Sequence, residues 1–348
     1  MYSRLIKHII IILIVVACGV LEAAACTSMV VSARASASGR PMLWKHRDTG
    51  ADHNFIDRVP AQGPDELSYV GLFNGGDSLY SEAWMGMNDC GFAIMNTASY
   101  NLVPDTAKLK DREGVLMAMA LKKCRTVDDF RNMLDSLPRP MGVQANFGVI
   151  DAHGRAAYFE TWDDGFIPYY IGGDGEPTAM IRTNFSVAGN DSTGMGYIRY
   201  ENAQHLLGPT AEAATLSPDD FLAVASCSYW HSMMERDPYT DGDIWAIDQD
   251  FIPRRSSMAS VVIEGCDSTG NPSDMLMHAI VGYPPLGDVH IATLSEVPEP
   301  LRPTLPGFRC RACEETQQRM RQAFPIQRGS GPRYLNLDVI RQWRTTHH

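Results

Sequence analysis

The chain has 348 residues, of which 45% are hydrophobic and 20% charged, a composition that is ordinary for a globular protein with a large core. Its formal net charge at pH 7 is -11 and it contains no block of Lys or Arg, so neither nucleic acid nor an anionic membrane is expected as a partner. The length suits one large domain or two of common size.

Residues 1–25 have the pattern of a signal peptide. A basic start at residues 4–8 precedes an apolar run at residues 9–21, and small residues at 23–25 form a cleavage site. The apolar run is too short for a convincing membrane span. We therefore expect signal peptidase to cut before Cys26 and the mature protein to be periplasmic or secreted.

A lipoprotein is the alternative product of export. The lipid would be attached to Cys18 or Cys26, but neither residue has the leucine that is expected three positions upstream. A lipid-modified Cys26 would also carry an acylated amine, which cannot act as a base. The sequence therefore favours an unmodified mature N-terminus.

Stretches rich in β-branched and aromatic residues that end at turn residues predict strands along the chain. The predicted strands are residues 26–33, 41–46, 91–98, 145–152, 156–162 and 259–265. Two of them are joined by the turn Asp151-Ala152-His153-Gly154 into a clear hairpin.

Helical patterns lie between and after these strands. The predicted helices are residues 114–125, residues 127–137 capped by Thr126, residues 199–207, a helix that starts at 217–220, and one near 311–323. This order favours an α+β fold in which helices cover the sheets. We expect one domain at residues 26–295 and a C-terminal extension, residues 296–348, that packs on the domain or trails from it.

The chain has eight cysteines, of which Cys18 lies in the leader. Apart from Cys26, six remain, and an oxidising compartment would allow them fifteen disulfide pairings. Cys310 and Cys313 form a Cys-x-x-Cys pair, but no second pair accompanies it, so a structural role is favoured over redox or zinc chemistry. The acidic stretch 235–250 lacks the register of a calcium loop. We expect no metal and no cofactor.

An N-terminal cysteine has its own catalytic chemistry. An unperturbed cysteine thiol has a pKa of about 8.5 and an α-amine one of about 7.7–8.0, so at neutral pH the amine is partly unprotonated and within reach of the sulfur. One residue can thus supply both the nucleophile and the general base. The alternative interpretation is that Cys26 is first in the mature chain only because signal peptidase must cut somewhere.

The predicted opening hairpin brings charged residues toward this cysteine. With a turn at residues 36–39, antiparallel pairing places Cys26 opposite residues 49–51, and the side chains of Lys45, Arg47 and Asp48 return to the neighbourhood of the sulfur. A cation there would favour the thiolate, and Asp48 could orient the amine. The alternative is a surface strand end with mixed charges.

These residues resemble the opening hairpin of the N-terminal-nucleophile (Ntn) hydrolases, through "CTS" at the processed start, "ASASGRP" and "LWKHRD". Within them the chain is most similar to the cysteine branch of choloylglycine hydrolases, penicillin V acylase, acyl-CoA:6-aminopenicillanic acid acyltransferase and a group of dipeptidases. Further segments that resemble this branch, between residues 26 and 290, are "GMNDCGFAIMN" (86–96), "ANFGVIDAHGRAAYFE" (145–160), "IRTNFS" (181–186) and "RRSSMASVVIEG" (254–265).

The resemblance implies a four-layer αββα sandwich of two antiparallel sheets between helices, and it assigns roles to the opening hairpin. Cys26 matches the nucleophile, with its α-amine as the base, and Asp48 matches the aspartate that holds the amine. The family usually has an Arg three residues before this Asp. Here Lys45 takes that place and Arg47 stands beside the Asp, so the sequence leaves open which cation flanks the sulfur.

Other roles come from the later motifs. Asn184 matches the asparagine that donates to the oxyanion, and Asn96 matches a second donor or a substrate contact. Arg254 or Arg255 matches a late arginine, and Asn146 is a candidate pocket residue.

The expected activity is that of an exported cysteine amidohydrolase that cleaves a linear C–N amide of a small-molecule or short-peptide substrate through a thioester. An acyltransferase using the same acyl-enzyme, and a non-catalytic exported binding protein that retains the fold, are the alternatives. A homo-oligomer is compatible with the sequence.

Overall fold

The computed structural model describes residues 25–102, 110–190, 192–327 and 333–347. The predicted signal peptide, apart from Ala25, lies outside the described residues. Within the described residues the chain forms two large antiparallel sheets and one small one. Sheet A has the order β10 (Ala179–Arg182), β1 (Cys26–Val31), β2 (Met42–Asp48), β12 (Ser257–Glu264), β13 (Leu276–Val281) and β14 (His290–Ala292).

Sheet B runs in sequence order and is built from one hairpin after another. Its strands are β3 (Asn54–Val59), β4 (Tyr69–Asn74), β5 (Met85–Asn88), β6 (Ala93–Ala98), β7 (Ala145–Ile150), β8 (Ala156–Trp162) and β9 (Gly165–Ile171). The small sheet consists of β11 (Trp245–Ile247), β16 (Arg333–Asn336) and β15 (Ile326–Gln327). The predicted hairpin of residues 145–162 is confirmed as β7 and β8, which pair from Ala145↔Thr161 to Ile150↔Ala156.

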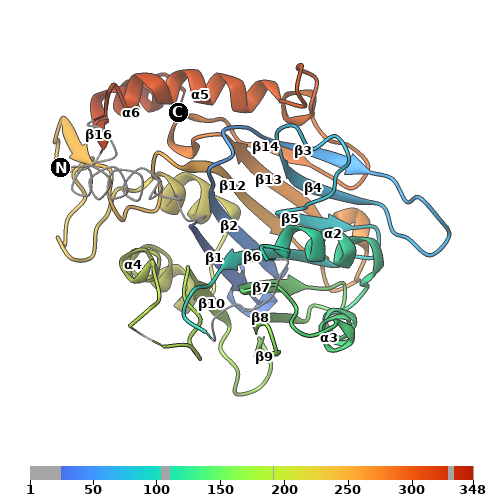
Figure 1. Ribbon diagram of the computed structural model, residues 1–348. Helices are drawn as coiled ribbons and strands as arrows, with labels where there is room; N and C mark the ends of the chain where they lie inside the picture. Colours follow the sequence, from blue (N-terminus) through green and yellow to red (C-terminus); the bar gives the residue numbers. More distant parts are fainter. Residues whose placement is uncertain (1–24, 103–109, 191, 328–332, 348) are drawn as a thin grey trace, which may run out of the picture.

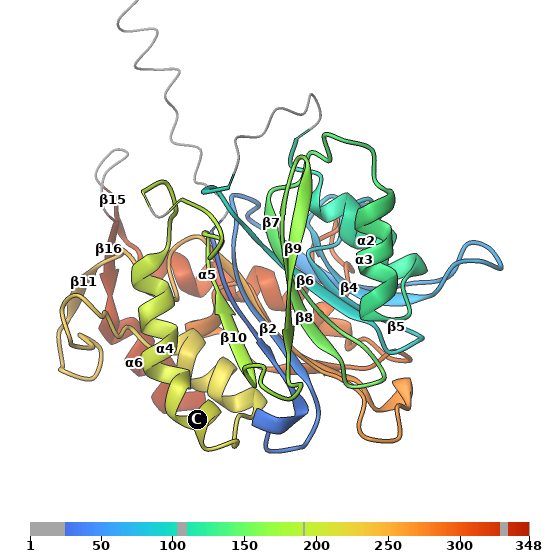
Figure 2. The same ribbon diagram turned by 90° about the horizontal axis from the view of Figure 1, so that it is seen from below.

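Helices cover the outer faces of both sheets, which produces the predicted αββα sandwich (Figures 1 and 2). The helices are α2 (Glu113–Lys123), α3 (Val127–Ser136), α4 (Tyr197–Glu212), α5 (Arg311–Ala323) and α6 (Leu337–His347). Helices α2 and α3 lie on sheet B, whereas α4 and α5 pack on strands of sheet A. The four-layer fold class expected from the sequence is therefore confirmed.

Because side chains alternate along β2, sheet A contributes residues to the hydrophobic cores on both of its faces. Leu43 joins the core between the two sheets, whereas Met42 and Trp44 join the core beneath α4. Because successive side chains of a strand point to opposite faces, Lys45 and Arg47 face sheet B, and His46 and Asp48 face the outer layer. This strand ends beside the start of β1, where Cys26 lies.

The register of the opening hairpin differs from the predicted one. Cys26 pairs with Arg47, not with residues 49–51, and the last pair is Val31↔Met42. The prediction continued the strands up to a tight turn, whereas the chain leaves the sheet after Val31 and makes a 3-10 turn at Ala33–Ala35. As a result Arg47 lies directly opposite the cysteine.

Several elements agree with the sequence and others were not predicted. Helix α5 has the predicted bounds, and Thr126 caps α3 in a capping box with Asp129. The helix expected after residue 217 is only a short π-helical turn at Asp220–Val224 followed by a 3-10 turn. The strands β3, β4, β5, β9, β10, β11, β13, β14, β15 and β16 and helix α6 were missed.

The C-terminal residues contribute to a core of their own on sheet A. Met320 of α5 and Leu337 and Ile340 of α6 pack with Tyr229 and Tyr283. The described cysteines are all free thiols, so none of the disulfides that the composition allows is formed there. In the described part of the chain, no helix is both long and apolar enough to cross a membrane.

Candidate active site

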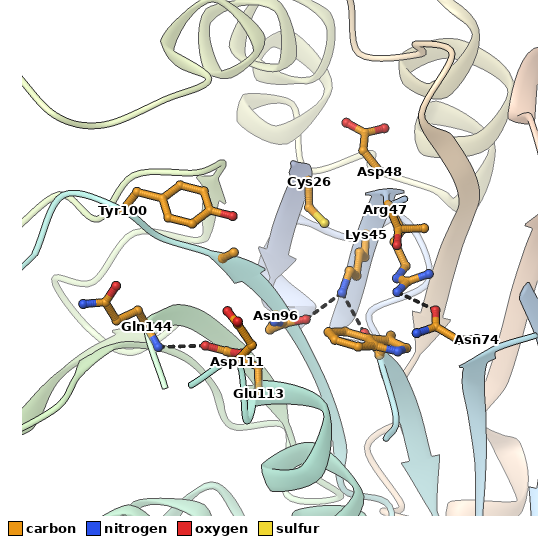
Figure 3. A pocket seen from close by; sticks show the side chains of 13 residues that line it. Cys26, Lys45, Arg47, Asp48, Asn74, Asn96, Tyr100, Asp111, Glu113 and Gln144 are labelled. Atoms are coloured by element: carbon orange, nitrogen blue, oxygen red, sulfur yellow. Dashed lines mark hydrogen bonds between the residues drawn. The ribbon is translucent and has the colours of Figure 1, made fainter. Parts of the chain in front are cut away.

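Cys26 begins β1 at the edge of a small cavity between the sheets. The residue is buried, with 5% of its surface exposed, and its sulfur points into the cavity (Figure 3). The cavity has a volume of about 200 Å³. Its described lining residues are Cys26, Lys45, Arg47, Asp48, Thr49, Asn74, Trp84, Asn96, Ala98, Tyr100, Asp111, Glu113 and Gln144. Most of these side chains are polar, so the cavity can hold a polar group in a fixed orientation.

Both polar groups of the peptide bond between Ala25 and Cys26 form hydrogen bonds. The N–H of Cys26 donates to Asn184 Oδ1 at 3.0 Å, and the carbonyl of Ala25 accepts from the N–H of Asp48 at 3.0 Å. Cleavage of this bond would therefore release the α-amine beside both Asn184 and Asp48.

Lys45 lies inside the cavity and orients Asn96. Its Nζ donates to Asn96 Oδ1 at 2.7 Å and to the carbonyl of Trp84 at 2.8 Å. Because an ammonium group can only donate, the carbonyl oxygen of Asn96 must face Lys45 and its NH₂ group faces away. Burial lowers the pKa of Lys45 from 10.5 to about 7, while the nearby Cys26 opposes this shift.

Arg47 is the second cation beside the cysteine. Its guanidinium donates to Asn54 and, at 2.9 Å, to Asn74 Oδ1, and it stacks over the ring of Trp84 at 4.7 Å. Burial lowers its pKa to about 10, and Cys26 is the largest influence in the other direction. Lys45 and Arg47 therefore both flank the sulfur, whereas the sequence left a choice between them. Arg47, and Lys45 in its protonated form, therefore place positive charge in the cavity that the sulfur faces.

Asp48, the last residue of β2, carries a buried carboxylate. Arg254 forms an ion pair with its Oδ2, and the hydroxyl of Ser257 donates to its Oδ1 at 2.5 Å. Of the two predicted late arginines, Arg254 thus reaches the site. Arg255 does not, since its N–H bonds Asp248 and its guanidinium contacts the sulfur of Met320 on α5.

Asn184 follows β10 and bridges the nucleophile to the rest of the site. Its Oδ1 accepts from the N–H of Cys26, and its Nδ2 donates to the carbonyl of Ala98 at 2.9 Å. Neither Asn184 nor Asn146 is among the described residues that line the cavity, although the resemblance made Asn146 a pocket candidate. It is fully buried, and its Nδ2 donates to the carbonyl of Phe185 at 2.9 Å, so it supports the segment that carries Asn184.

Arg199 is a site residue that the sequence did not reveal. It extends from α4 and donates to the carbonyl of Cys26 and to Asn184 Oδ1, both at 2.7 Å, and to Thr27 Oγ1 at 3.1 Å. A guanidinium only donates, so it fixes the carbonyl oxygen of Asn184 toward the cysteine. The sequence shows Arg199 only as one cation of an amphipathic helix, and its burial becomes visible once α4 packs on β1.

The far side of the cavity carries further residues that no sequence motif marked. Tyr100 points its hydroxyl toward the cysteine side, and burial raises its pKa to about 12 (Figure 3). Glu113, at the start of α2, accepts from the backbone N–H of Gln144 at 2.8 Å. Asp111 adds a second carboxylate to this wall. The cavity therefore has cations near the sulfur and carboxylates opposite.

The described residues form no group of three or more His, Cys, Asp or Glu that could hold a metal ion. The chemistry that this site can perform rests on side chains and an amine. A thiol faces the cavity beside Lys45 and Arg47, and Asn96 lies in the cavity wall. Asn184 accepts from the N–H of Cys26, and the backbone N–H of Asp48 binds the carbonyl of Ala25. These are the groups that acyl transfer requires, namely a nucleophile, a base and hydrogen-bond donors for an oxyanion.

Lys45→Met should stabilise the protein in a pH-dependent way. The folded-state pKa of Lys45 is lower than that of the unfolded chain, so between about pH 7 and 10.5 the unfolded state binds more protons and wild-type stability rises with pH. The variant lacks this rise. We expect it to gain about 1–3 kcal/mol in free energy of unfolding at or below pH 7, and less as pH increases.

Urea unfolding in a Cys26→Ala background, from about pH 6 to about pH 9, would measure this difference without titration of the thiol. A gain that does not change with pH would contradict a buried, titrating Lys45.

No family model matches the chain, and no curated protein matches it significantly. Solved structures that are similar to it include an orthologue of N-acylethanolamine-hydrolyzing acid amidase from Caenorhabditis elegans, with a TM-score of 0.46, 14% identity, and coverage of 69% of this chain and 92% of that one. A mutant of the conjugated bile acid hydrolase from Clostridium perfringens has a TM-score of 0.45 at 10% identity, covering 78% and 93%. Penicillin V acylase from Agrobacterium tumefaciens has a TM-score of 0.41 at 12% identity, covering 78% and 87%.

Proposed function

We propose that the chain is an exported amidohydrolase of the cysteine Ntn-hydrolase group, which cleaves a linear C–N amide through a thioester on Cys26. The observation that carries this proposal is the arrangement around the Ala25–Cys26 peptide. Asn184 and Asp48 bind its two polar groups, while the sulfur faces a cavity that contains two buried cations. Removal of the leader by signal peptidase would turn the nitrogen of Cys26 into a free amine beside Asn184 and Asp48.

The reaction follows from these positions. The α-amine of Cys26 takes the thiol proton, and the thiolate attacks the carbonyl carbon of the substrate amide. The oxyanion that forms accepts hydrogen bonds from the side-chain amides of Asn184 and Asn96. The α-ammonium then protonates the leaving nitrogen as the C–N bond breaks, which leaves a thioester. A water molecule, deprotonated by the same amine, attacks the thioester and releases the carboxylic acid and the thiol.

Asp48 supports the base in this scheme. A carboxylate beside the α-ammonium stabilises the charged form that appears when the thiol proton has moved. Arg254 holds the carboxylate from the other side, and Lys45 and Arg47 stabilise the thiolate. The α-ammonium and the thiolate therefore each have a partner of opposite sign, and the oxyanion has neutral amide donors.

The cavity favours a small acyl group. A volume of about 200 Å³ is less than the roughly 300–1,000 Å³ of pockets that hold drug-sized ligands. We therefore rank short peptides and small N-acyl amino acids above conjugated bile acids and other bulky amides as substrates.

The proposal is tested on protein recovered after export. Intact-mass analysis should give a chain that starts at Cys26 with an unmodified amine, and iodoacetamide should label this cysteine faster than any other. A panel of peptide, aminoacyl, phenoxyacetyl, bile-acid and long-chain acyl amides should show hydrolysis, with small acyl groups preferred. The control is the same chain produced with Ala25 retained, which has the thiol but no amine beside it and should be inactive. Activity of this control equal to that of the mature chain would refute the mechanism.

A further inference from the structure

The carboxylate of Asp48 is held by more than its ion pair with Arg254. Ser257, at the start of β12, pairs with Asp48 in the sheet register, and a bulge separates it from Ala259. Such a bulge redirects the side chain of the strand. The hydroxyl of Ser257 lies 2.5 Å from Asp48 Oδ1 and 2.8 Å from His46 Nε2. His46, Ser257 and the side chain of Asp48 are all buried.

The direction of each hydrogen bond in this cluster follows from counting protons. A serine hydroxyl has one proton and two lone pairs, and an ionised carboxylate only accepts. The proton of Ser257 therefore points to Asp48. Its oxygen accepts from the backbone N–H of Arg254 at 2.9 Å. The remaining partner, His46 Nε2, must then be the donor, so His46 carries its proton on Nε2.

The surroundings of His46 agree with this tautomer. Its Nδ1 is buried and has no hydrogen-bond partner among the described residues, which suits a bare lone pair better than an N–H. Burial lowers the pKa of His46 to about 4, with Asp48 opposing and Arg254 and Arg199 reinforcing the shift. The ring is thus a neutral donor throughout the neutral pH range.

We propose that His46 and Ser257 form a hydrogen-bond relay that fixes the Asp48 carboxylate against the amine of Cys26, and that both are positioning residues for the reaction. The inference rests on the proposed function, since it concerns the group that holds the catalytic base. Each bond of the relay polarises the next, so His46 strengthens the bond from Ser257 to Asp48 without touching the cysteine. Both residues lie in segments that resemble the family, but the sequence assigned a role to neither.

Four variants test the relay by steady-state kinetics of the mature protein. Ser257→Ala removes the donor to Asp48, and His46→Leu removes the donor to Ser257. His46→Gln keeps an N–H near the position of Nε2. Ser260→Ala is the matched control, because this buried serine lies on the same strand and pairs with His46 in the register, but its hydroxyl bonds Trp44 and Ser226.

If the relay positions Asp48, variants that break it should lower kcat and leave KM nearly unchanged. Ser257→Ala and His46→Leu should lower kcat by about 10–100-fold with KM changed by less than about 3-fold, because misplacement of a catalytic group affects the transition state. His46→Gln and Ser260→Ala should stay within about 3-fold of wild type. A wild-type kcat in Ser257→Ala, or an equal loss in Ser260→Ala, would overturn the relay.

A spectroscopic measurement keeps the test independent of activity. In protein labelled with ¹⁵N-histidine, the His46 ring, assigned by its absence in His46→Gln, should be the neutral Nε2–H tautomer at neutral pH, and its Nε2 signal should shift in Ser257→Ala. An Nδ1–H tautomer or an imidazolium at this position would overturn the relay. The two proposals can fail separately. If wild-type protein shows the Nε2–H tautomer of His46 but hydrolyses no amide, the proposed function is refuted while the hydrogen bonds of the relay are supported.

Discussion

Cys26→Ala is expected to lower amide turnover by about 10⁴-fold or more, because loss of the nucleophile removes the covalent route and leaves only binding and oxyanion stabilisation. The mature variant keeps its amine and all backbone hydrogen bonds of β1, so folding should be nearly unaffected. Its free energy of unfolding should change by less than about 1 kcal/mol, since only a sulfur atom at the cavity edge is lost. The measurements are single-turnover hydrolysis of the best substrate and urea unfolding.

Cys124→Ala provides the control for this prediction. Cys124 is also buried, but it lies outside the cavity. Burial raises the pKa of its thiol to about 12, and a thiol with such a pKa is unreactive at neutral pH. This variant should keep wild-type turnover. Activity of Cys26→Ala above a trace, with the variant shown to be pure, would remove Cys26 as the nucleophile. A loss of activity in both variants would indicate damage to the fold.

Asn184→Ala is expected to lower kcat by about 10²–10³-fold, which is the usual effect of removing one oxyanion donor. The change also removes the acceptor for the N–H of Cys26 and for Arg199, so two donors lose their partner. A stability loss of about 1–3 kcal/mol should accompany it. Because the donor acts mainly in the transition state, KM should change much less than kcat.

Asn202→Ala is the matched control for Asn184. Asn202 is a buried asparagine of α4 whose amide bonds the carbonyl of Asp250 and the N–H of Ser232, whereas Asn184 binds the N–H of Cys26. It should lose stability but keep kcat when both variants are assayed well below their unfolding temperatures. A kcat for Asn184→Ala within about 3-fold of wild type would exclude Asn184 from transition-state stabilisation.

The sequence predicted the residues of the site better than their contacts. Motifs marked Cys26, Asp48, Asn184 and either Arg254 or Arg255, and the structure brings Arg254 together with the first three. The catalytic roles of these residues stay predictions until the variants are measured. The sequence left open whether Lys45 or Arg47 flanks the sulfur, whereas the structure places both in the cavity wall, because residues two apart on β2 face the same side.

Residues that reach the site only through tertiary packing could not be identified from the sequence. Arg199, His46 and Ser257 become recognisable only when α4 and β12 lie against β1 and β2. Local patterns also hid some strands. Strand β9 contains Pro168, which normally argues against a strand, but it forms an edge of sheet B where the missing N–H is tolerated.

The alternation along β2 separates two groups of residues. Every described wall of the cavity beyond the opening hairpin comes from sheet B and its connections, whereas the groups around the nitrogen and carbonyl of Cys26 and the side chain of Asp48 come from α4, β12 and the segment after β10. If the proposed function is correct, substitutions in the walls from sheet B should change which acyl group is accepted and leave the groups around the base in place.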